Sequence, residues 1–311
     1  MRHGTVPAAL AVARPEGRRR VAVNRSLAPA DHRGGLCGAQ MAEIGDGQRP
    51  LNTGTAHSAR VYDYILGGKN HYEADVAAGD AMIEVWPALP VHMRANRAFM
   101  LRASRYLARE RGIRQFLDIG TGLPTSPNLH EVVQEVEPTA RVVYVDNDPI
   151  VLNYAQALLA STPQGRTTYV HADMRDPDAI LGSAEFRATL DLDEPIALLV
   201  IGMLHFIHPS DDDHGLLRRL LEPLPAGSYL AATIGTADFA PEEVGRVAEQ
   251  YAAEGMPMAL RTHQEASAFF TGLELVDPGV VQVHKWRPGP DDEPVCDEDI
   301  AMYGALARKP D

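Results

Sequence analysis

Three aspartates follow short apolar runs, and this pattern could hold a nucleoside. Asp118 ends the stretch QFLD and is followed by Gly120 and Gly122, while Asp146 and Asp173 follow the next apolar runs along the chain. Asp146 lies 24 residues after Gly122, near the spacing at which a carboxylate reaches a ribose. A carboxylate accepts hydrogen bonds from both ribose hydroxyls and so orients a nucleoside, and Asp173 could accept one from an adenine amino group. The alternatives are a helix cap at Asp146 and a turn residue at Asp173.

The stretch FLDIGTGLP, residues 116–124, predicts a strand that stops at a tight turn beneath a ligand. Glycine lets the backbone bend sharply and approach a ligand without a Cβ in the way. A dinucleotide, a phosphate and S-adenosylmethionine can each lie above such a turn. The dinucleotide fingerprint requires Gly or Ala where this chain has Thr125, and the triphosphate loop requires a Gly-Lys-Ser/Thr run that does not follow here. A dinucleotide and a purely structural turn stay open as alternatives.

Two histidines follow the most apolar run of the chain, PIALLVIG at residues 195–202. Imidazole titrates near neutral pH, so a histidine at this place can act as a general base. His205 is the first choice for this catalytic role, and His208 and Tyr64 are weaker choices. The alternative for His205 is a packed structural residue, and an acceptor that reacts through carbon or a carboxylate needs no base.

Alternating strand and helix patterns surround these residues. An amphipathic helix is predicted over residues 94–112, because apolar side chains recur there at helical spacing. The alternation predicts an α/β fold with a doubly wound, mostly parallel sheet, whose ligands bind above the carboxyl ends of the strands. A turn at residues 277–279 predicts a C-terminal antiparallel hairpin. Strands are predicted at residues 115–119, 141–145, 166–170, 195–202 and 227–235, with the hairpin at 273–286.

The segment from Arg60 to Asp80 combines aromatic, polar and glycine residues. Helical stretches are predicted on both sides of Gly67-Gly68, which makes the segment a candidate lid that excludes water from an active site. The alternative is a surface helical hairpin. Further on, Arg94 is predicted to pair with a cofactor carboxylate, because a guanidinium matches that group through two parallel hydrogen bonds. A solvated arginine in the first turn of its helix is the rival interpretation.

Overall charge argues against a nucleic acid partner. The 311 residues carry a formal net charge of −13, so the folded part is expected to repel a phosphate backbone. No apolar run approaches the roughly 20 residues that span a bilayer, and two cysteines are too few for a disulfide framework or a cysteine-built metal site. We therefore expect a cytoplasmic protein with no metal site and with neither nucleic acid nor membrane as a partner. The oligomeric state stays open, with a homodimer among the alternatives.

The strand-end motifs together resemble those of the Rossmann-like S-adenosylmethionine-dependent methyltransferases. LDIGTG is similar to their glycine motif, VDNDP to the acidic end of their second strand, and HADMRD to their adenine contact. LHFIHPSDD resembles a segment of small-molecule methyltransferases and differs from the Asn/Asp-Pro-Pro-Tyr motif of enzymes that methylate amino groups of bases. SARVYDYILGGKNHYEAD (58–75) and RANRAFM (94–100) resemble a narrower actinobacterial group of uncharacterised S-adenosyl methyltransferases.

The resemblance implies a seven-stranded Rossmann-like sheet, S-adenosyl-L-methionine as methyl donor, S-adenosyl-L-homocysteine as product, and an unidentified small-molecule acceptor. The glycine turn would approach the methionine and the sulfonium, Asp146 would bind the ribose, and Asp118 would orient the turn or reach the methionine ammonium through water. An NAD(P)-dependent oxidoreductase and a non-catalytic regulatory protein stay open as alternatives. The cofactor-binding residues predicted in this way are Asp118, Gly120, Thr121, Gly122, Asp146, Asn147, Asp173 and Met174, to which we add Arg94 and Met203.

These observations divide the chain into four parts. Residues 1–40 carry seven Arg and two acidic residues and lack apolar periodicity, so residues 1–50 are predicted to be an extension without packed structure. Residues 51–112 are predicted to form an N-terminal helical lid segment and residues 113–288 the Rossmann-like donor-binding core. Residues 289–311 are predicted to be a C-terminal tail.

Overall fold

A computed structural model describes residues 53–158, 161–290, 292 and 294–311. They fall within a single unit of the chain, Arg49–Asp311. The predicted extension over residues 1–50 lies outside the described residues. Among the residues that the structure describes, every helix falls short of the length and apolar character that a bilayer crossing requires.

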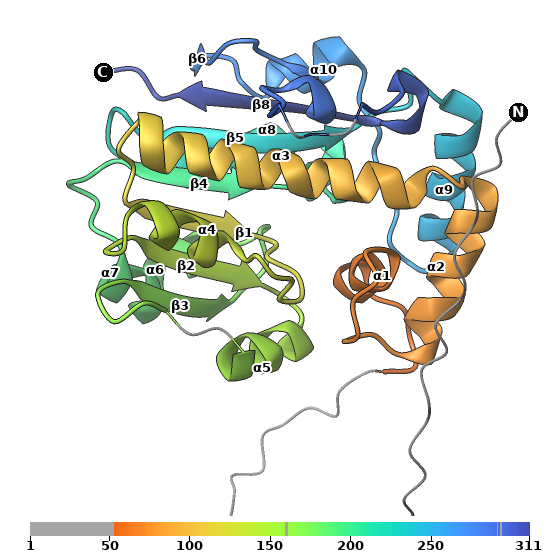
Figure 1. Cartoon of the computed structure of the whole chain (residues 1–311), viewed down its shortest axis with the longest axis horizontal. Coiled ribbons are helices and arrows are strands. Elements are labelled where there is room, and N and C mark those ends of the chain that lie inside the picture. The colour runs from red at the N-terminus through yellow and green to blue at the C-terminus, as the bar shows by residue number, and fades with distance from the viewer. Residues whose placement is uncertain (1–52, 159–160, 291, 293) are drawn as a thin grey trace, which may run out of the picture. The chain divides into compact units, whose positions relative to one another are not determined.

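A mostly parallel sheet forms the centre of this unit (Figure 1). Its strands are β1 Gln115–Ile119, β2 Arg141–Asp146, β3 Arg166–His171, β4 Ile196–Val200, β5 Tyr229–Gly235, β6 Glu274–Leu275, β7 Val281–Gln282 and β8 Met302–Arg308. The strands are arranged in the order β3-β2-β1-β4-β5-β8-β6. From β1 the chain continues to one side of the sheet through β2 and β3, and then returns to the other side at β4. In doubly wound sheets a ligand binds in the crevice at such a switch between β1 and β4. The predicted α/β class, with a doubly wound parallel sheet and antiparallel C-terminal strands, is confirmed.

The antiparallel part of the sheet differs from the prediction in detail. β8 lies between β5 and β6 and pairs with β5 along its whole length. The predicted hairpin gives only two short strands, β6 and β7, which both pair with β8 and not with each other. The prediction of a tail over residues 289–311 is therefore wrong, because MYGALAR is a buried strand inside the sheet.

Helices cover both faces of the sheet because side chains along each strand alternate between the faces. On β1, Phe116 packs in one apolar cluster with residues of α3 and α4, while Leu117 packs in another with residues of α6, α7 and α8. Burial on both faces explains the uninterrupted apolar run of β4. The helices are α1 Ser58–Ile65, α2 Glu73–Val85, α3 Leu89–Glu110, α4 Leu129–Val136, α5 Pro149–Leu158, α6 Pro177–Gly182, α7 Ala184–Thr189, α8 Asp213–Leu221, α9 Pro241–Ala253 and α10 His263–Ala268, with short 3-10 turns η1 Leu204–Phe206, η2 Pro209–Asp211, η3 Val283–Lys285 and η4 Asp297–Asp299.

The predicted lid segment over residues 51–112 divides into two parts. α1 and α2 lie on either side of Gly67-Gly68, as predicted, and share a third apolar cluster with α9. Between them, the buried carboxylate of Asp63 accepts hydrogen bonds from the amide of Asn70 at 2.9 Å and from His71 Nδ1 at 3.0 Å, which closes the connection. The long helix α3 instead covers the sheet (Figure 1), so including it in a lid was wrong.

Candidate active site

The turn after β1 has the backbone that the glycine motif predicts. Gly120 and Gly122 have φ of 71° and 67°, a region that only glycine adopts at little cost. The amides of Gly120 and Thr121 donate to the carbonyl of Val145 at 2.8 and 3.1 Å, so the turn folds back over the end of β2. A Cβ on Gly120 would collide with the side chain of Met203. The absence of that Cβ therefore lets Met203 lie directly against the turn.

Asp146 fixes the turn to the second strand while keeping its capacity to accept further hydrogen bonds. One carboxylate oxygen accepts from the amide of Gly122 at 2.8 Å and the other from the amide of Asp148 at 2.9 Å. Burial raises the pKa of Asp146, and the two amide donors oppose that rise. Each carboxylate oxygen has a second lone pair beyond these bonds, which is what binding both hydroxyls of a ribose requires.

The end of β3 meets the end of β2 through a pair of side chains. Asn147 Nδ2 donates to Asp173 Oδ2 at 3.0 Å, and the amide of Arg175 donates to Asp173 Oδ1 at 2.8 Å. Met174 beside them is buried, with 3% of its surface exposed. These contacts hold a partly exposed carboxylate and a thioether beside each other at the edge where the adenine was expected.

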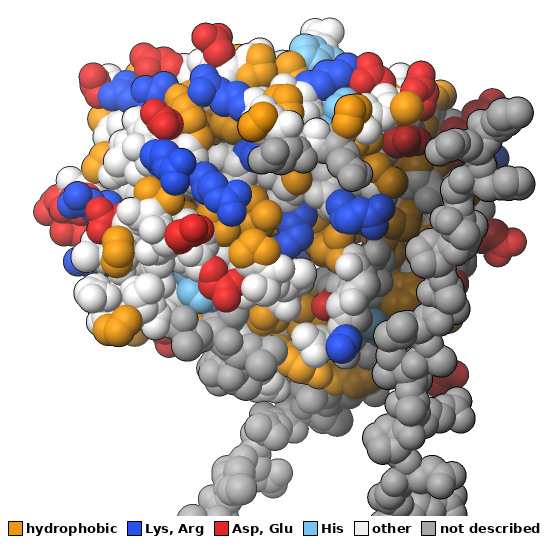
Figure 2. Space-filling view, in the orientation of Figure 1, with side chains coloured by type: hydrophobic (Ala, Val, Ile, Leu, Met, Phe, Trp, Pro, Cys, Tyr) orange, Lys and Arg blue, Asp and Glu red, His pale blue; other side chains and the backbone are white. Residues whose placement is uncertain are grey.

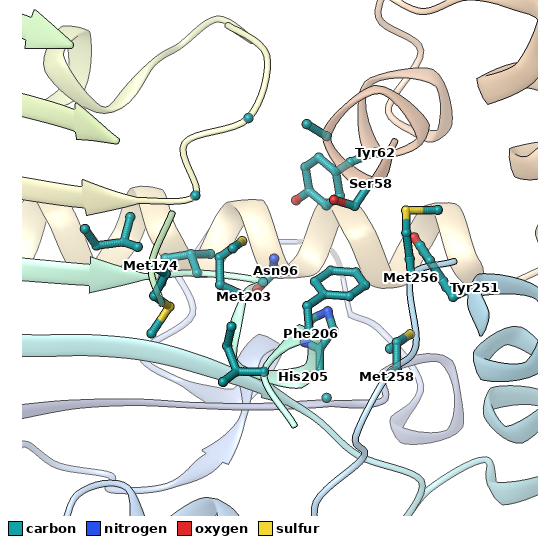
Figure 3. Close-up of a pocket in the computed structure, with 18 of the residues that line it drawn as sticks. Ser58, Tyr62, Asn96, Met174, Met203, His205, Phe206, Tyr251, Met256 and Met258 are labelled. Atoms are coloured by element: carbon teal, nitrogen blue, oxygen red, sulfur yellow. The ribbon is translucent and has the colours of Figure 1, made fainter. Parts of the chain in front are cut away.

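A single cavity of about 460 Å³ connects these strand ends with His205 in η1, the 3-10 turn that follows β4. Its volume falls within the roughly 300–1,000 Å³ of small-molecule sites. Figure 3 shows Met174 and Met203 at one end of this cavity and Phe206, Met256 and Met258 towards the other. The predicted residues that line it are Asp118, Gly120, Thr121, Gly122, Asp146, Asn147, Asp173, Met174, Met203, His205 and His208.

Asp118 precedes the glycine turn and is buried, and its surroundings bring the pKa of its carboxyl close to neutral pH. Burial raises its pKa to about 7, the neighbouring carboxylate of Asp146 adds to the rise, and the guanidinium of Arg97 opposes it. A cation that approached this carboxyl would favour the ionised form. The ammonium of S-adenosylmethionine, the expected ligand, would be such a cation.

The arginine at the site is Arg97 rather than the predicted Arg94. Arg94 is exposed on α3 and does not line the cavity, and Figure 2 shows Lys and Arg side chains gathered along this face of the molecule. Arg97 lies one turn further on, lines the cavity, and donates to the carbonyls of Thr125 and, at 2.8 Å, Pro127. Its place on the same helical face as buried Met93 and Met100 was the signal that the prediction missed.

The prediction of Tyr64 as a catalytic residue is also corrected. Its hydroxyl bonds to Asp80 on α2, and the side chain does not line the cavity. Tyr62, on another side of α1, does line the cavity, and its hydroxyl donates to the carbonyl of Met93 at 3.1 Å. Residues two positions apart on a helix do not share a face, so α1 can present only one of these tyrosines to the cavity.

His205 is a buried, neutral imidazole at the cavity wall. It is 5% exposed, and its ring lies 4.4 Å from that of Phe206. Burial lowers its pKa to about 3, and the nearby His92 and Arg261 contribute to the same direction. Its Nδ1 has no hydrogen-bond partner. His208 lies at the exposed rim, with Nδ1 2.7 Å from Ser210 Oγ.

Two further buried polar residues on α3 line the cavity and were not predicted. His92 Nδ1 accepts from the amide of Ala301 at 3.2 Å, and burial lowers its pKa to about 4. Asn96 is 2% exposed, and its side-chain oxygen has no partner. Polar residues on the apolar face of VHMRANRAFM were the available signal, since buried polar groups normally have partners.

The fold and the strand-end site together define a Rossmann-like enzyme that binds a nucleoside cofactor. A family model described as S-adenosyl methyltransferase matches residues 45–310, and the chain belongs to this family. S-adenosyl-L-methionine is therefore its methyl donor and methyl transfer its reaction, which decides against the oxidoreductase and regulatory alternatives. The site fits this donor. The carboxylate of Asp146 can accept further hydrogen bonds beyond that from Gly122, and the neighbouring turn has glycine at position 120, where a Cβ would not fit.

Solved structures that are similar to this chain include two from actinobacteria. A protein from Streptomyces avermitilis, of a family defined as a domain of unknown function, is 67% identical, with a TM-score of 0.82 over 84% of this chain and 100% of its own. A candidate methyltransferase from Thermobifida fusca is 37% identical, with a TM-score of 0.78 over 84% of this chain and 97% of its own. Both sources agree with the predicted actinobacterial group. Among curated proteins, no sequence matches this chain.

Proposed function

We propose that this methyltransferase acts on a small molecule, which binds in the same cavity as the donor and beside it. The observation that carries the proposal is the continuity of the cavity, whose wall runs from Asp146 and the glycine turn to His205. The far wall is made of buried side chains such as Trp86, Leu89 and Val247. A volume of about 460 Å³ leaves room for a compact acceptor beside the donor, whereas a macromolecule would need an open groove.

In this proposal the strand ends hold the donor. Asp146 binds the ribose hydroxyls, and Asp173 and Met174 hold the adenine. The turn from Gly120 to Gly122 lies against the methionine part, whose ammonium is met by Asp118. Arg97 takes the role first given to Arg94 and attracts the methionine carboxylate through its charge, because its Nη2 already donates to the carbonyls of Thr125 and Pro127. When bound, S-adenosyl-L-methionine supplies a methyl group on a positively charged sulfur, and a nucleophilic atom of the acceptor takes it up.

His205 is the proposed base for a hydroxyl acceptor. Because its pKa is lowered to about 3, the ring is neutral at physiological pH and acts only as a weak base, which accepts a hydrogen bond from the hydroxyl and passes the released proton on to solvent. The orphaned Nδ1 at the cavity wall supports this role. Alignment of donor and acceptor supplies the main part of the rate enhancement, because in-line transfer is chiefly a positioning task.

The size of the acceptor is tested with donor that carries a labelled methyl group. The protein is incubated with a Streptomyces cell extract split by ultrafiltration into a small-molecule and a macromolecule fraction. We expect label to enter the small-molecule fraction with the wild type and far less with Asp146→Ala. Label that enters only the macromolecule fraction, or neither fraction while the donor still binds, contradicts the proposal. Calorimetry with S-adenosyl-L-homocysteine provides that binding check.

A further inference from the structure

The half of the cavity away from the strand ends has a chemistry of its own. We call it the acceptor chamber. Figure 3 shows Phe206, Tyr251, Met256 and Met258 around it, with Asn96 and His205 at its border towards Met203. These side chains come from η1, α3, α9 and the loop after α9. Trp86 and Val247 complete the apolar wall.

Charged side chains are confined to the other half of the cavity and its rim. The described charged residues that line the cavity are Asp118, Asp146, Asp173, Arg97, Arg175 and Asp211. The last two pair with each other at 3.8 Å, both exposed. Within the chamber, His92 and His205 are neutral because burial lowers the pKa of each, to about 4 and about 3. A charged group placed there would lose its hydration without gaining a partner of opposite charge.

Aromatic and thioether surfaces dominate what the chamber offers. The rings of Phe206 and Tyr251 meet edge to face, with centroids 5.5 Å apart, and Met256 and Met258 line the wall next to them. Aromatic rings favour edge and offset contacts with other rings. Methionine sulfur adapts to irregular shapes and makes favourable contacts with aromatic rings. An aromatic ligand therefore suits these walls better than an aliphatic or strongly hydrated one.

Two buried polar atoms in this region have no hydrogen-bond partner. They are Oδ1 of Asn96 and Nδ1 of His205, on side chains that are 2% and 5% exposed. Both side chains line the cavity. An unsatisfied buried polar group destabilises the protein, and a ligand that hydrogen-bonds to it recovers the lost free energy. An amide oxygen only accepts, so the group that meets Asn96 must donate.

We infer that the acceptor chamber binds an uncharged aromatic compound with a hydroxyl substituent, to which Asn96 and His205 form hydrogen bonds. This inference rests on the proposed function and names the substrate class of the same site. A hydroxyl fits both residues because it can donate to Asn96 Oδ1 and accept from His205 in the tautomer whose Nδ1 is protonated, or donate to His205 in the other tautomer. A carboxylate cannot donate to Asn96, and an ammonium would enter a chamber without a counter-charge.

The test compares four small probes that each contain one benzene ring: para-cresol, para-hydroxybenzoate, tyramine and toluene. They present respectively a neutral phenol, an anion, a cation and a ring without a hydroxyl. Dissociation constants are measured by ligand-observed NMR on the full chain saturated with S-adenosyl-L-homocysteine. We expect para-cresol to bind at least about tenfold more tightly than either charged probe, and about fivefold more tightly than toluene, a difference of about 1 kcal/mol. A charged probe that matches or exceeds para-cresol, or a set without any preference, overturns the inference.

Variants test the two hydrogen-bonding residues separately. Asn96→Ala and His205→Ala should each lower the affinity for para-cresol about fivefold and leave the affinity for toluene unchanged. His214→Ala is the matched control, because His214 is exposed on α8, stacks on Phe269 and does not line the cavity. Met258→Glu should reverse the order of the probes in favour of tyramine. Unaltered para-cresol binding in both alanine variants contradicts the assignment of these residues.

Donor binding and methyl transfer distinguish a wrong substrate class from a wrong proposed function. If the wild type binds S-adenosyl-L-homocysteine but shows no preference for para-cresol, the substrate class is wrong and the proposed function stands. If the labelled methyl group enters macromolecules, the proposed function itself fails. The probe comparison on the wild type needs no variant, so the inference stays testable even where a substitution prevents folding.

Discussion

The two halves of the cavity are built on different principles. The donor half consists of backbone amides and carboxylates at the ends of β1, β2 and β3, and its contacts join Gly122 to Asp146 and Asn147 to Asp173. The acceptor chamber consists of apolar and neutral polar side chains from helices and a loop. In our proposal the donor is therefore held mainly by charge and hydrogen bonds at the strand ends, whereas the acceptor is held mainly by shape and burial.

The largest effect is expected when the carboxylate proposed to bind the ribose, that of Asp146, is removed. Asp146→Ala should weaken binding of S-adenosyl-L-homocysteine about 10- to 100-fold, because hydrogen bonds to a charged group contribute about 1.5–3 kcal/mol. The affinity for para-cresol at saturating S-adenosyl-L-homocysteine should change less than about twofold, well under 1 kcal/mol. Calorimetry and NMR measure the two affinities. Asp193→Ala, an exposed aspartate before β4, is the control, and an unchanged donor affinity in Asp146→Ala would falsify the ribose assignment.

The halves should also differ in their response to pH. Burial raises the pKa of Asp118 to about 7, so below that pH its carboxyl is neutral and does not attract the methionine ammonium. Donor affinity should therefore rise roughly tenfold from about pH 5.5 to about pH 7.5. Binding of para-cresol should stay level, because His205 and His92 have pKa values lowered to about 3 and about 4 and are neutral throughout this range.

Asp118→Asn provides the control for that pH dependence. The variant keeps a side chain of similar size but cannot ionise, so its donor affinity should be low and level with pH. A slope that survives in Asp118→Asn would assign the titration to another group. Isothermal calorimetry in a single mixed buffer of constant ionic strength measures both proteins.

A smaller effect is expected at the arginine beside the donor half. Arg97→Ala should lower donor affinity about fivefold, close to 1 kcal/mol, because the guanidinium lies near Asp118 and holds the carbonyls of Thr125 and Pro127. Arg94→Ala, three residues away but exposed and outside the cavity, should bind the donor like the wild type. Equal losses in the two variants would contradict the correction from Arg94 to Arg97.

The smallest effect is expected at Tyr64. Tyr64→Phe removes a hydroxyl that bonds to Asp80 away from the cavity, so donor affinity and turnover should change less than about twofold, as for other surface substitutions. Turnover of the labelled donor measures this. A loss of more than tenfold would return Tyr64 to the catalytic residues and place α1 differently over the site during the reaction.

The donor half could be predicted from the sequence because each of its motifs is a contiguous strand end. LDIGTG, VDND and HADM need only the rule that parallel strands deliver their carboxyl ends to one edge. The prediction chose Arg94, one helical turn before Arg97. Helical periodicity shows only roughly which side of a helix faces the core, whereas the end of a strand identifies a particular residue. β8 was missed because the hairpin at 273–286 already supplied an antiparallel strand.

The acceptor chamber was predicted only at His205. Met256 and Met258 are ordinary apolar residues in the sequence, and Asn96 lies in a helix that packs on the sheet. They are distributed over residues 86–96, 205–206 and 247–258, and no local spacing relates these segments. Only the apolar cluster that α3 and α9 share with α1 and α2 brings them to one cavity, so their common role is a tertiary property.

The position of β8 has a consequence for how this protein is made. β8 fills the gap between β5 and β6, and the amide of Ala301 just before it holds His92 in place. Chains emerge from the ribosome starting with the N-terminal part and domains generally fold as units, so the sheet is complete only when β8 has been translated. A chain that ended before β8 would leave the backbone groups of β5 unpaired along one edge and His92 without the amide of Ala301.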